Sequence, residues 1–188
     1  MDFDLPTRRR VLRATGGTAL FGLAGCLGDD GGTDTGTSDG GLSGPQPSAT
    51  VDMIQSEDGS ENYNDPLVVW VENGGTVTFV MDSGNHSATA YSEENDQPRR
   101  IPEGANSFDS GVLLDEGETF EHTFETEGVY DYFCIPHHGM GMVGSVIVGQ
   151  PSPDGQPGLA EPQSSLPGDA GSAISEVNQL VRDALGDG

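Results

Sequence analysis

The sequence predicts an all-β protein, a Greek-key β-sandwich with disordered linkers around it and one short helix at the C-terminal end. Between Ala49 and Gly149, short apolar runs alternate with clusters of turn-forming residues, a pattern typical of sandwiches. On both sides of this stretch the chain is rich in Gly, Pro, Ser and Thr, which bury too little apolar surface to form a core. The 188 residues therefore suffice for one domain of about 100 residues and its flanks.

The composition is strongly acidic. The net charge is −24 at pH 7, and the chain contains no lysine. A negative field of this size repels nucleic acid, which excludes that class of partner. It also opposes compact folding by self-repulsion, unless salt shortens the screening length to about 3 Å at 1 M. We therefore expect a protein from a halophile.

The first 26 residues have the features of an export signal. Residues 7–12 read Thr-Arg-Arg-Arg-Val-Leu and resemble a twin-arginine signal. The apolar stretch from Ala14 to Ala24 is too short to span a bilayer. It ends in Leu-Ala-Gly-Cys26, which resembles the lipobox of lipoproteins, so we expect cleavage before Cys26 and a lipid on its sulfur. The alternative is a small apolar cysteine at the end of an ordinary signal.

The remaining chain divides into a tether, a sandwich and a tail. Residues 27–48 are expected to form a flexible acidic linker that holds the next domain off the membrane. Strands of the 49–149 domain are expected at 51–54, 67–71, 76–81, 118–124, 129–134 and 144–148, with a hairpin turn at Asn73-Gly-Gly. The stretch 91–106 is polar and irregular and is expected to be a long loop.

Residues 150–188 are expected to hold a second linker and a short amphipathic helix. Gln150 to Gly171 is again rich in Pro, Gly and Ser. In the helix expected from Ser172 to Leu185, one face would carry the apolar side chains Ile174, Val177, Leu180, Val181 and Ala184. Ser172 is the expected N-cap, and Gly186 follows the expected end. We expect the helix to dock on its own domain.

One stretch, residues 130–144, carries the chemistry. It reads Tyr-Asp-Tyr-Phe-Cys134-Ile-Pro-His137-His-Gly-Met-Gly-Met142-Val-Gly and places a thiolate, an imidazole and a thioether in nine residues. A cysteine with two histidines in one plane and a weak axial methionine is the ligand set of a blue-copper electron-transfer site. Met is a poor ligand for zinc, so the thioether favours copper.

The second histidine must come from outside this motif or from its neighbour. His138 adjoins His137, and two adjacent side chains in extended backbone point in different directions. His122 shares a strand face with two phenylalanines, which favours an ordinary strand histidine. His86 follows an apolar run and a Gly-Asn turn, from which a loop can direct it toward Cys134. We therefore select His86 as the second imidazole ligand.

The motif Cys134-x-Pro-His137-x-Gly-x-Gly-Met142-x-Gly resembles the copper loop of plastocyanins and halocyanins, the small blue copper proteins of the cupredoxin family. The resemblance covers residues 49–149 and implies a halophilic archaeon as the source. It also bears on the axial ligand, because Met142 gives the plastocyanin-like spacing and Met140 the amicyanin-like spacing. Only Met142 is followed by the x-Gly-x-Val of both families, which favours Met142. Ser87 stands where the family usually has Asn after the first histidine.

The resemblance implies a membrane-anchored one-electron carrier with one copper ion, cycling between Cu(II) and Cu(I). We expect it to exchange electrons with a membrane donor and a terminal acceptor on the outer face of the cell membrane, as a monomer. The alternative is a copper-binding or storage protein, or a surface module that keeps its metal for stability. An enzyme is not expected, because the sequence holds the ligands of one mononuclear site and no second copper motif.

Overall fold

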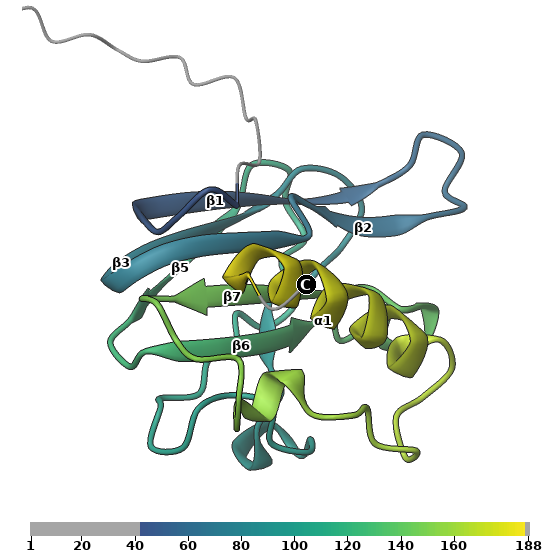
Figure 1. The fold of residues 1–188 in the computed structure, drawn as a ribbon. Helices are drawn as coiled ribbons and strands as arrows, with labels where there is room; N and C mark the ends of the chain where they lie inside the picture. Colours follow the sequence, from purple (N-terminus) through teal and green to yellow (C-terminus); the bar gives the residue numbers. More distant parts are fainter. Residues whose placement is uncertain (1–41, 187–188) are drawn as a thin grey trace, which may run out of the picture. The chain divides into compact units, whose positions relative to one another are not determined.

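The computed structural model describes residues 42–186, which form a mostly β structure with one helix at the C-terminal end (Figure 1). The strands are β1 (Gln46–Gln55), β2 (Asn62–Asp65), β3 (Val68–Met81), β4 (Thr89–Ala90), β5 (Thr119–Phe124), β6 (Gly128–Phe133) and β7 (Val143–Val148). Three short 3-10 turns, η1 (Glu93–Asn95), η2 (His138–Met140) and η3 (Pro157–Leu159), precede the helix α1 (Ala170–Leu185). The predicted all-β fold class with a C-terminal helix is confirmed.

The longest strand, β3, joins the two layers of the sandwich. Its first four residues pair with β7, and its later part pairs with β1 on one side and β5 on the other. The predicted hairpin turn at 73–75 is wrong, because the strand continues through it. A tight hairpin turn of the Asn-Gly type needs positive φ at two successive residues, and here only Gly74 has it, at 85°. The residues at 73–75 therefore form an irregularity at which β3 passes from one layer to the other.

The main core lies between the layers. Side chains alternate along each strand, so Val77 and Phe79 of β3 face Tyr132 of β6 and Val146 of β7 in one continuous cluster. This cluster also contains Cys134 and Met142. Two of the predicted ligands are therefore anchored in the core of the sandwich.

A second core lies on the outer face of β6 and β7, where α1 covers the sheet (Figure 1). Ile174, Val177 and Val181 of the helix pack there against apolar side chains of both strands. Docking of the helix on its own domain is confirmed. The helix begins at Ala170, earlier than the predicted Ser172, and Asp169 stands at the N-cap position without a side-chain capping hydrogen bond. Leu180, expected on the buried face, is 40% exposed.

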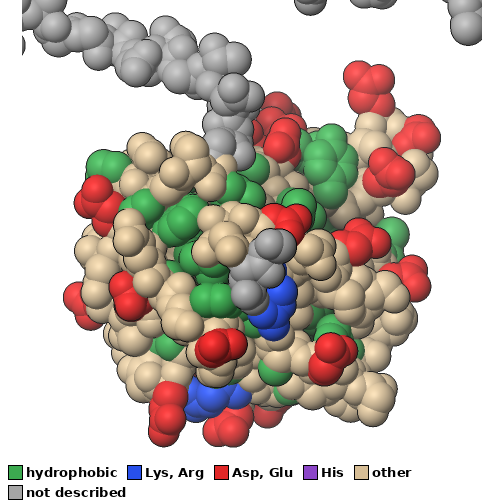
Figure 2. Space-filling view, in the orientation of Figure 1, with side chains coloured by type: hydrophobic (Ala, Val, Ile, Leu, Met, Phe, Trp, Pro, Cys, Tyr) green, Lys and Arg blue, Asp and Glu red, His purple; other side chains and the backbone are tan. Residues whose placement is uncertain are grey.

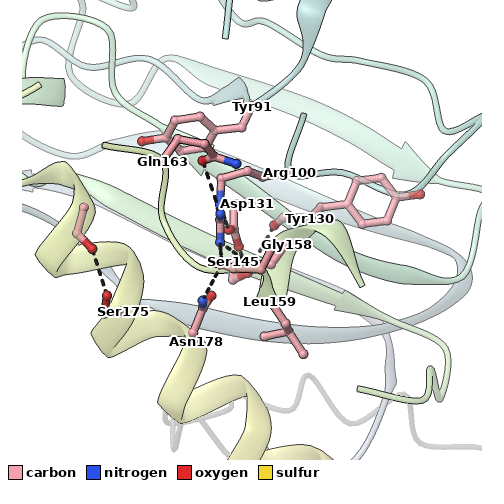
Figure 3. A network of polar contacts seen from close by, with 12 residues as sticks. Tyr91, Arg100, Tyr130, Asp131, Ser145, Gly158, Leu159, Gln163, Ser175 and Asn178 are labelled. Atoms are coloured by element: carbon pink, nitrogen blue, oxygen red, sulfur yellow. Dashed lines mark hydrogen bonds and ion pairs between the residues drawn. The ribbon is translucent and has the colours of Figure 1, made fainter. Parts of the chain in front are cut away.

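The expected linker 150–171 packs against the sheet. Arg100, from the loop between β4 and β5, is fully buried and donates from Nε to Asp131 Oδ2 at 2.7 Å (Figure 3). The same guanidinium donates to the backbone carbonyls of Gly158 and Ala160. A buried cation therefore fixes a segment that composition alone assigns to a linker.

The surface shown in Figure 2 carries scattered acidic side chains and few basic ones, as the composition requires. At the other boundary of the domain, β1 begins at Gln46, ahead of the expected Ala49. The proposed signal, Cys26 and most of the 27–48 tether lie outside the described residues. Within 42–186, no helix is long and apolar enough to cross a membrane.

Candidate metal centre

Three side chains from separate segments meet at one end of the main core. His86 lies in the loop after β3, Cys134 directly follows β6, and His137 lies in the turn before η2. Their nearest ligand atoms all lie within 4.8 Å of one another. His86 is held there by a pair of backbone hydrogen bonds with Leu113, at 2.8 and 3.3 Å. The structure therefore brings together the cysteine and both histidines selected from the sequence.

The spacing of these atoms fits a metal ion. Cys134 Sγ lies 3.6 Å from His86 Nδ1 and 3.5 Å from His137 Nδ1. Bonds of about 2.3 Å to sulfur and about 2.0 Å to nitrogen, as for zinc, separate the two atoms by about 3.5–3.8 Å at tetrahedral to trigonal angles. Because the observed distances lie in this range, the three side chains have the spacing of a metal site.

Burial and hydrogen bonding set the charge states of the three groups. Burial lowers the pKa of His86, and the neighbouring His137 lowers it further. Burial also lowers the pKa of His137. Both imidazoles are therefore neutral at neutral pH, the form that binds metals. Burial raises the pKa of the Cys134 thiol, while the amide of Ser87, which donates to Sγ at 3.4 Å, opposes the shift.

The two candidate methionines occupy different environments. Met142 is buried in the same cluster as Cys134, and its carbonyl accepts the Cys134 N–H at 3.0 Å. Met140 belongs to η2, is 54% exposed, and borders a shallow hollow with Tyr63 and Glu61. Only Met142 therefore belongs to the core that encloses the thiolate.

The two rejected histidines lie apart from the cluster. His122 stands on β5 and packs its ring between Phe108 and Phe124, both at 4.7 Å. His138 is buried, and its Nε2 lies 2.7 Å from the hydroxyl of Tyr91. Neither belongs to the group of metal-binding atoms found among the described residues.

Sequence reasoning missed a chain of hydroxyl groups behind the thiolate. Ser87 Oγ accepts the N–H of Ile135 at 2.8 Å and lies 3.0 Å from Thr89 Oγ1. Thr89 Oγ1 donates to Asp109 Oδ1 at 2.8 Å. Because the threonine proton points at the carboxylate, the serine must donate to the threonine. The spacing Ser87-x-Thr89 could have indicated this chain of hydroxyl groups, since residues two apart share one face of extended backbone.

A β-sandwich with a cysteine and two histidines at one end of its core is typical of mononuclear blue (type 1) copper proteins. The chain belongs to the family described as copper binding proteins, plastocyanin/azurin family, whose model matches residues 51–149. It carries one type 1 copper site with a ligand set of two histidines, a cysteine and a methionine.

Similar proteins support this membership. A halocyanin from Natronomonas pharaonis is 40% identical over 86 residues, which is 45% of this chain and 47% of the halocyanin, so the match spans about half of that protein. A plastocyanin from Scenedesmus fuscus is 34% identical over 45% of this chain and 84% of its own. Among solved structures, a pseudoazurin from Sinorhizobium meliltoi is 29% identical with a TM-score of 0.55, covering 73% of this chain and 98% of its own.

Proposed function

We propose that His86, Cys134, His137 and Met142 hold one copper ion, and that the protein carries single electrons between redox protein partners. The observation that carries this proposal is the cluster of His86, Cys134 and His137, whose ligand atoms all lie within 4.8 Å of one another. Bound copper supplies the one-electron couple between Cu(II) and Cu(I). The protein supplies a rigid frame for the metal site, because Cys134 and Met142 are packed in the main core.

The four residues have different tasks. Cys134 and His86 are buried and exclude water from the site. His137 is partly exposed and is flanked by the exposed residues Ile135, Pro136 and Met140. Its ring edge is therefore the route by which electrons enter and leave. Val143, which follows Met142, is buried and takes no part in this surface.

Copper loading of the purified protein tests this function. The oxidised protein should bind one copper ion and be intensely blue, from thiolate-to-copper charge transfer, and Cys134→Ser should abolish the colour. A colourless copper complex of the parent would contradict the site. Repeated cycling with a reductant and an oxidant, without release of metal, separates an electron carrier from a copper-storage protein or a surface module.

The proposal also includes a cellular location for the protein. The resemblance of Arg8 and Arg9 to a twin-arginine motif, and of Leu23 to Cys26 to a lipobox, supports export and a lipid anchor at the outer face of the membrane. Lysines at both arginine positions should leave precursor in the cytoplasm. Cys26→Ser should release the protein from the membrane fraction or leave it uncleaved, and unaltered fractionation would refute the anchor.

A further inference from the structure

The turn before α1 touches the part of the copper loop that lies between two ligands. The N–H of Asp169 donates to the carbonyl of Gly139 at 3.1 Å. Gly168 has a φ of 51°, and a Cβ added there would overlap the Gly139 carbonyl. The missing Cβ of Gly168 therefore allows the C-terminal segment to approach the loop more closely than any other residue at that position would permit.

A second contact lies one residue beyond Met140. Gly141 ends η2 with a φ of 82°, and a Cβ placed on it would lie 3.3 Å from the Cβ of Ala173. The same Cβ would lie 3.6 Å from the carbonyl oxygen and from the Cβ of Asp169. The first turn of α1 thus packs against the loop at Gly141, and the turn that precedes α1 contacts the loop at Gly139.

These contacts rest on a firmly held helix. Ile174, Val177 and Val181 are buried in the second core, on the outer face of the sheet. Upstream, the bonds of Arg100 to the 158–160 backbone fix the approach to the helix (Figure 3). Residues 167–173 are therefore anchored on both sides.

We propose that residues 167–173, the C-terminal brace, position the copper loop so that His137 and Met142 keep a fixed separation. The segment between these residues contains Gly139 and Gly141, whose backbones are free to adopt many conformations. The backbone hydrogen bonds within this segment are short-range, from Met140 and Met142 to the carbonyl of His137 and from Gly141 to the carbonyl of His138. A site whose supporting contacts are loose loses its geometry. The buried side chain of His138 holds this segment through Tyr91, and the brace supports its backbone at Gly139 and Gly141. This inference rests on the proposed copper site.

A matched pair of glycine variants tests the brace. Gly168→Ala places a methyl group against Gly139 and strains the backbone. Gly155→Ala causes similar strain, at a φ of 77°, but meets nothing within 4 Å. In the metal-free full chain, amide hydrogen exchange of Met140, Gly141 and Met142 should become several-fold faster in Gly168→Ala and stay at the parent rate in Gly155→Ala.

The copper-loaded proteins give the second measurement. Gly168→Ala should shift the charge-transfer band and the reduction potential and slow electron self-exchange several-fold, with Gly155→Ala matching the parent. Should Gly168→Ala unfold, Ala173→Val takes its place, because it enlarges the side chain that faces Gly141. Its control is Ala184→Val, a partly buried alanine further along the same helix.

The two measurements separate the brace from the site. Parent-like exchange and parent-like spectra in both brace variants would overturn the brace while the blue colour stands. Equal changes in a brace variant and its control would overturn it too, since they would indicate a general loss of stability. A colourless parent would overturn the proposed function, and the exchange rates of the metal-free chain would still decide whether the brace restrains the loop.

Discussion

The hydroxyl of Ser87 accepts the backbone N–H of Ile135 at 2.8 Å, which ties the loop of one copper-site histidine to the loop that carries the thiolate. The amide of the same serine donates to Cys134 Sγ at 3.4 Å. One residue therefore bonds to the sulfur and to the peptide that follows it. The serine stands where related proteins usually have an asparagine, and its hydroxyl supplies an acceptor at that position.

Removal of this hydroxyl should disturb the copper site. Ser87→Ala leaves the N–H of Ile135 without its acceptor in a partly buried bond, at a cost of about 0.5–1.5 kcal/mol, the net value of a typical hydrogen bond. The loosened loop should shift the reduction potential and the charge-transfer band, measured by voltammetry and visible spectroscopy. Ser110→Ala is the control, because its hydroxyl also accepts a backbone N–H, from Ala88 at 2.9 Å, outside the copper loop. Equal spectra for Ser87→Ala and the parent would rule out this role.

The axial ligand is tested by the two methionines of the loop. Met142→Gln replaces a buried thioether with a harder oxygen and should shift both the potential and the spectrum. Met140→Gln alters an exposed side chain and should leave both nearly unchanged. Visible spectra and voltammetry of the two variants provide the comparison. A reversed outcome would transfer the axial role to Met140.

The fold class and the candidate ligands could be predicted from the sequence, whereas some details of the fold could not, and the reason is local. Cys134, His137 and Met142 belong to one short motif, so their spacing alone indicates the chemistry. The Asn73-Gly-Gly segment is locally a good hairpin turn, and only pairing with distant strands keeps β3 continuous through it. Propensity cannot reveal such a long-range effect.

The helix that covers the outer face of the sheet could have been predicted from the pattern of apolar residues along the strands. Every residue of β6 and β7 is buried, which requires cover on both faces of these strands. Val129, Phe133 and Ile147 on the outer face are apolar and predict a covering element, and the helix meets this need. Arg100 gave no such signal, because a charged residue in a polar loop is ordinarily exposed.

The buried pair of Arg100 and Asp131 should be essential for stability. Arg100→Met leaves the Asp131 carboxylate buried without its partner and should lower the free energy of unfolding by about 3–5 kcal/mol. Replacement of both residues, Arg100→Met with Asp131→Leu, should recover much of the loss. Denaturant unfolding of the metal-free protein measures both effects.

The adjacent arginine provides the control for that measurement. Arg99 forms a longer contact with Glu93, at 3.9 Å, and both side chains are substantially exposed. Exposed ion pairs contribute little to stability, so Arg99→Met should unfold close to the parent. An Arg100→Met protein as stable as Arg99→Met would show that the buried pair does not hold the 158–160 segment in place.

The surface around His137 should select the redox partner. Met140, Ile135 and Pro136 are exposed there and uncharged, in a chain that is acidic almost everywhere else. High salt screens long-range steering, so contact burial dominates recognition under those conditions. Transient redox interfaces are small, below ~1,200 Å², and a single carboxylate within one is costly. Met140→Asp should therefore slow electron exchange with the natural partner several-fold and leave the copper spectrum unchanged.

A carboxylate elsewhere on the surface should have no such effect, which makes a charge change at Glu93 or Glu94 the control. Both lie in η1, on an exposed polar loop, and at high salt their removal should leave the exchange rate near that of the parent. Stopped-flow mixing of the oxidised variants with the reduced partner measures the rate. Because Met140 lies in the turn that directly follows His137, parent-like exchange by Met140→Asp would mean that electrons leave the protein by a route other than the His137 edge.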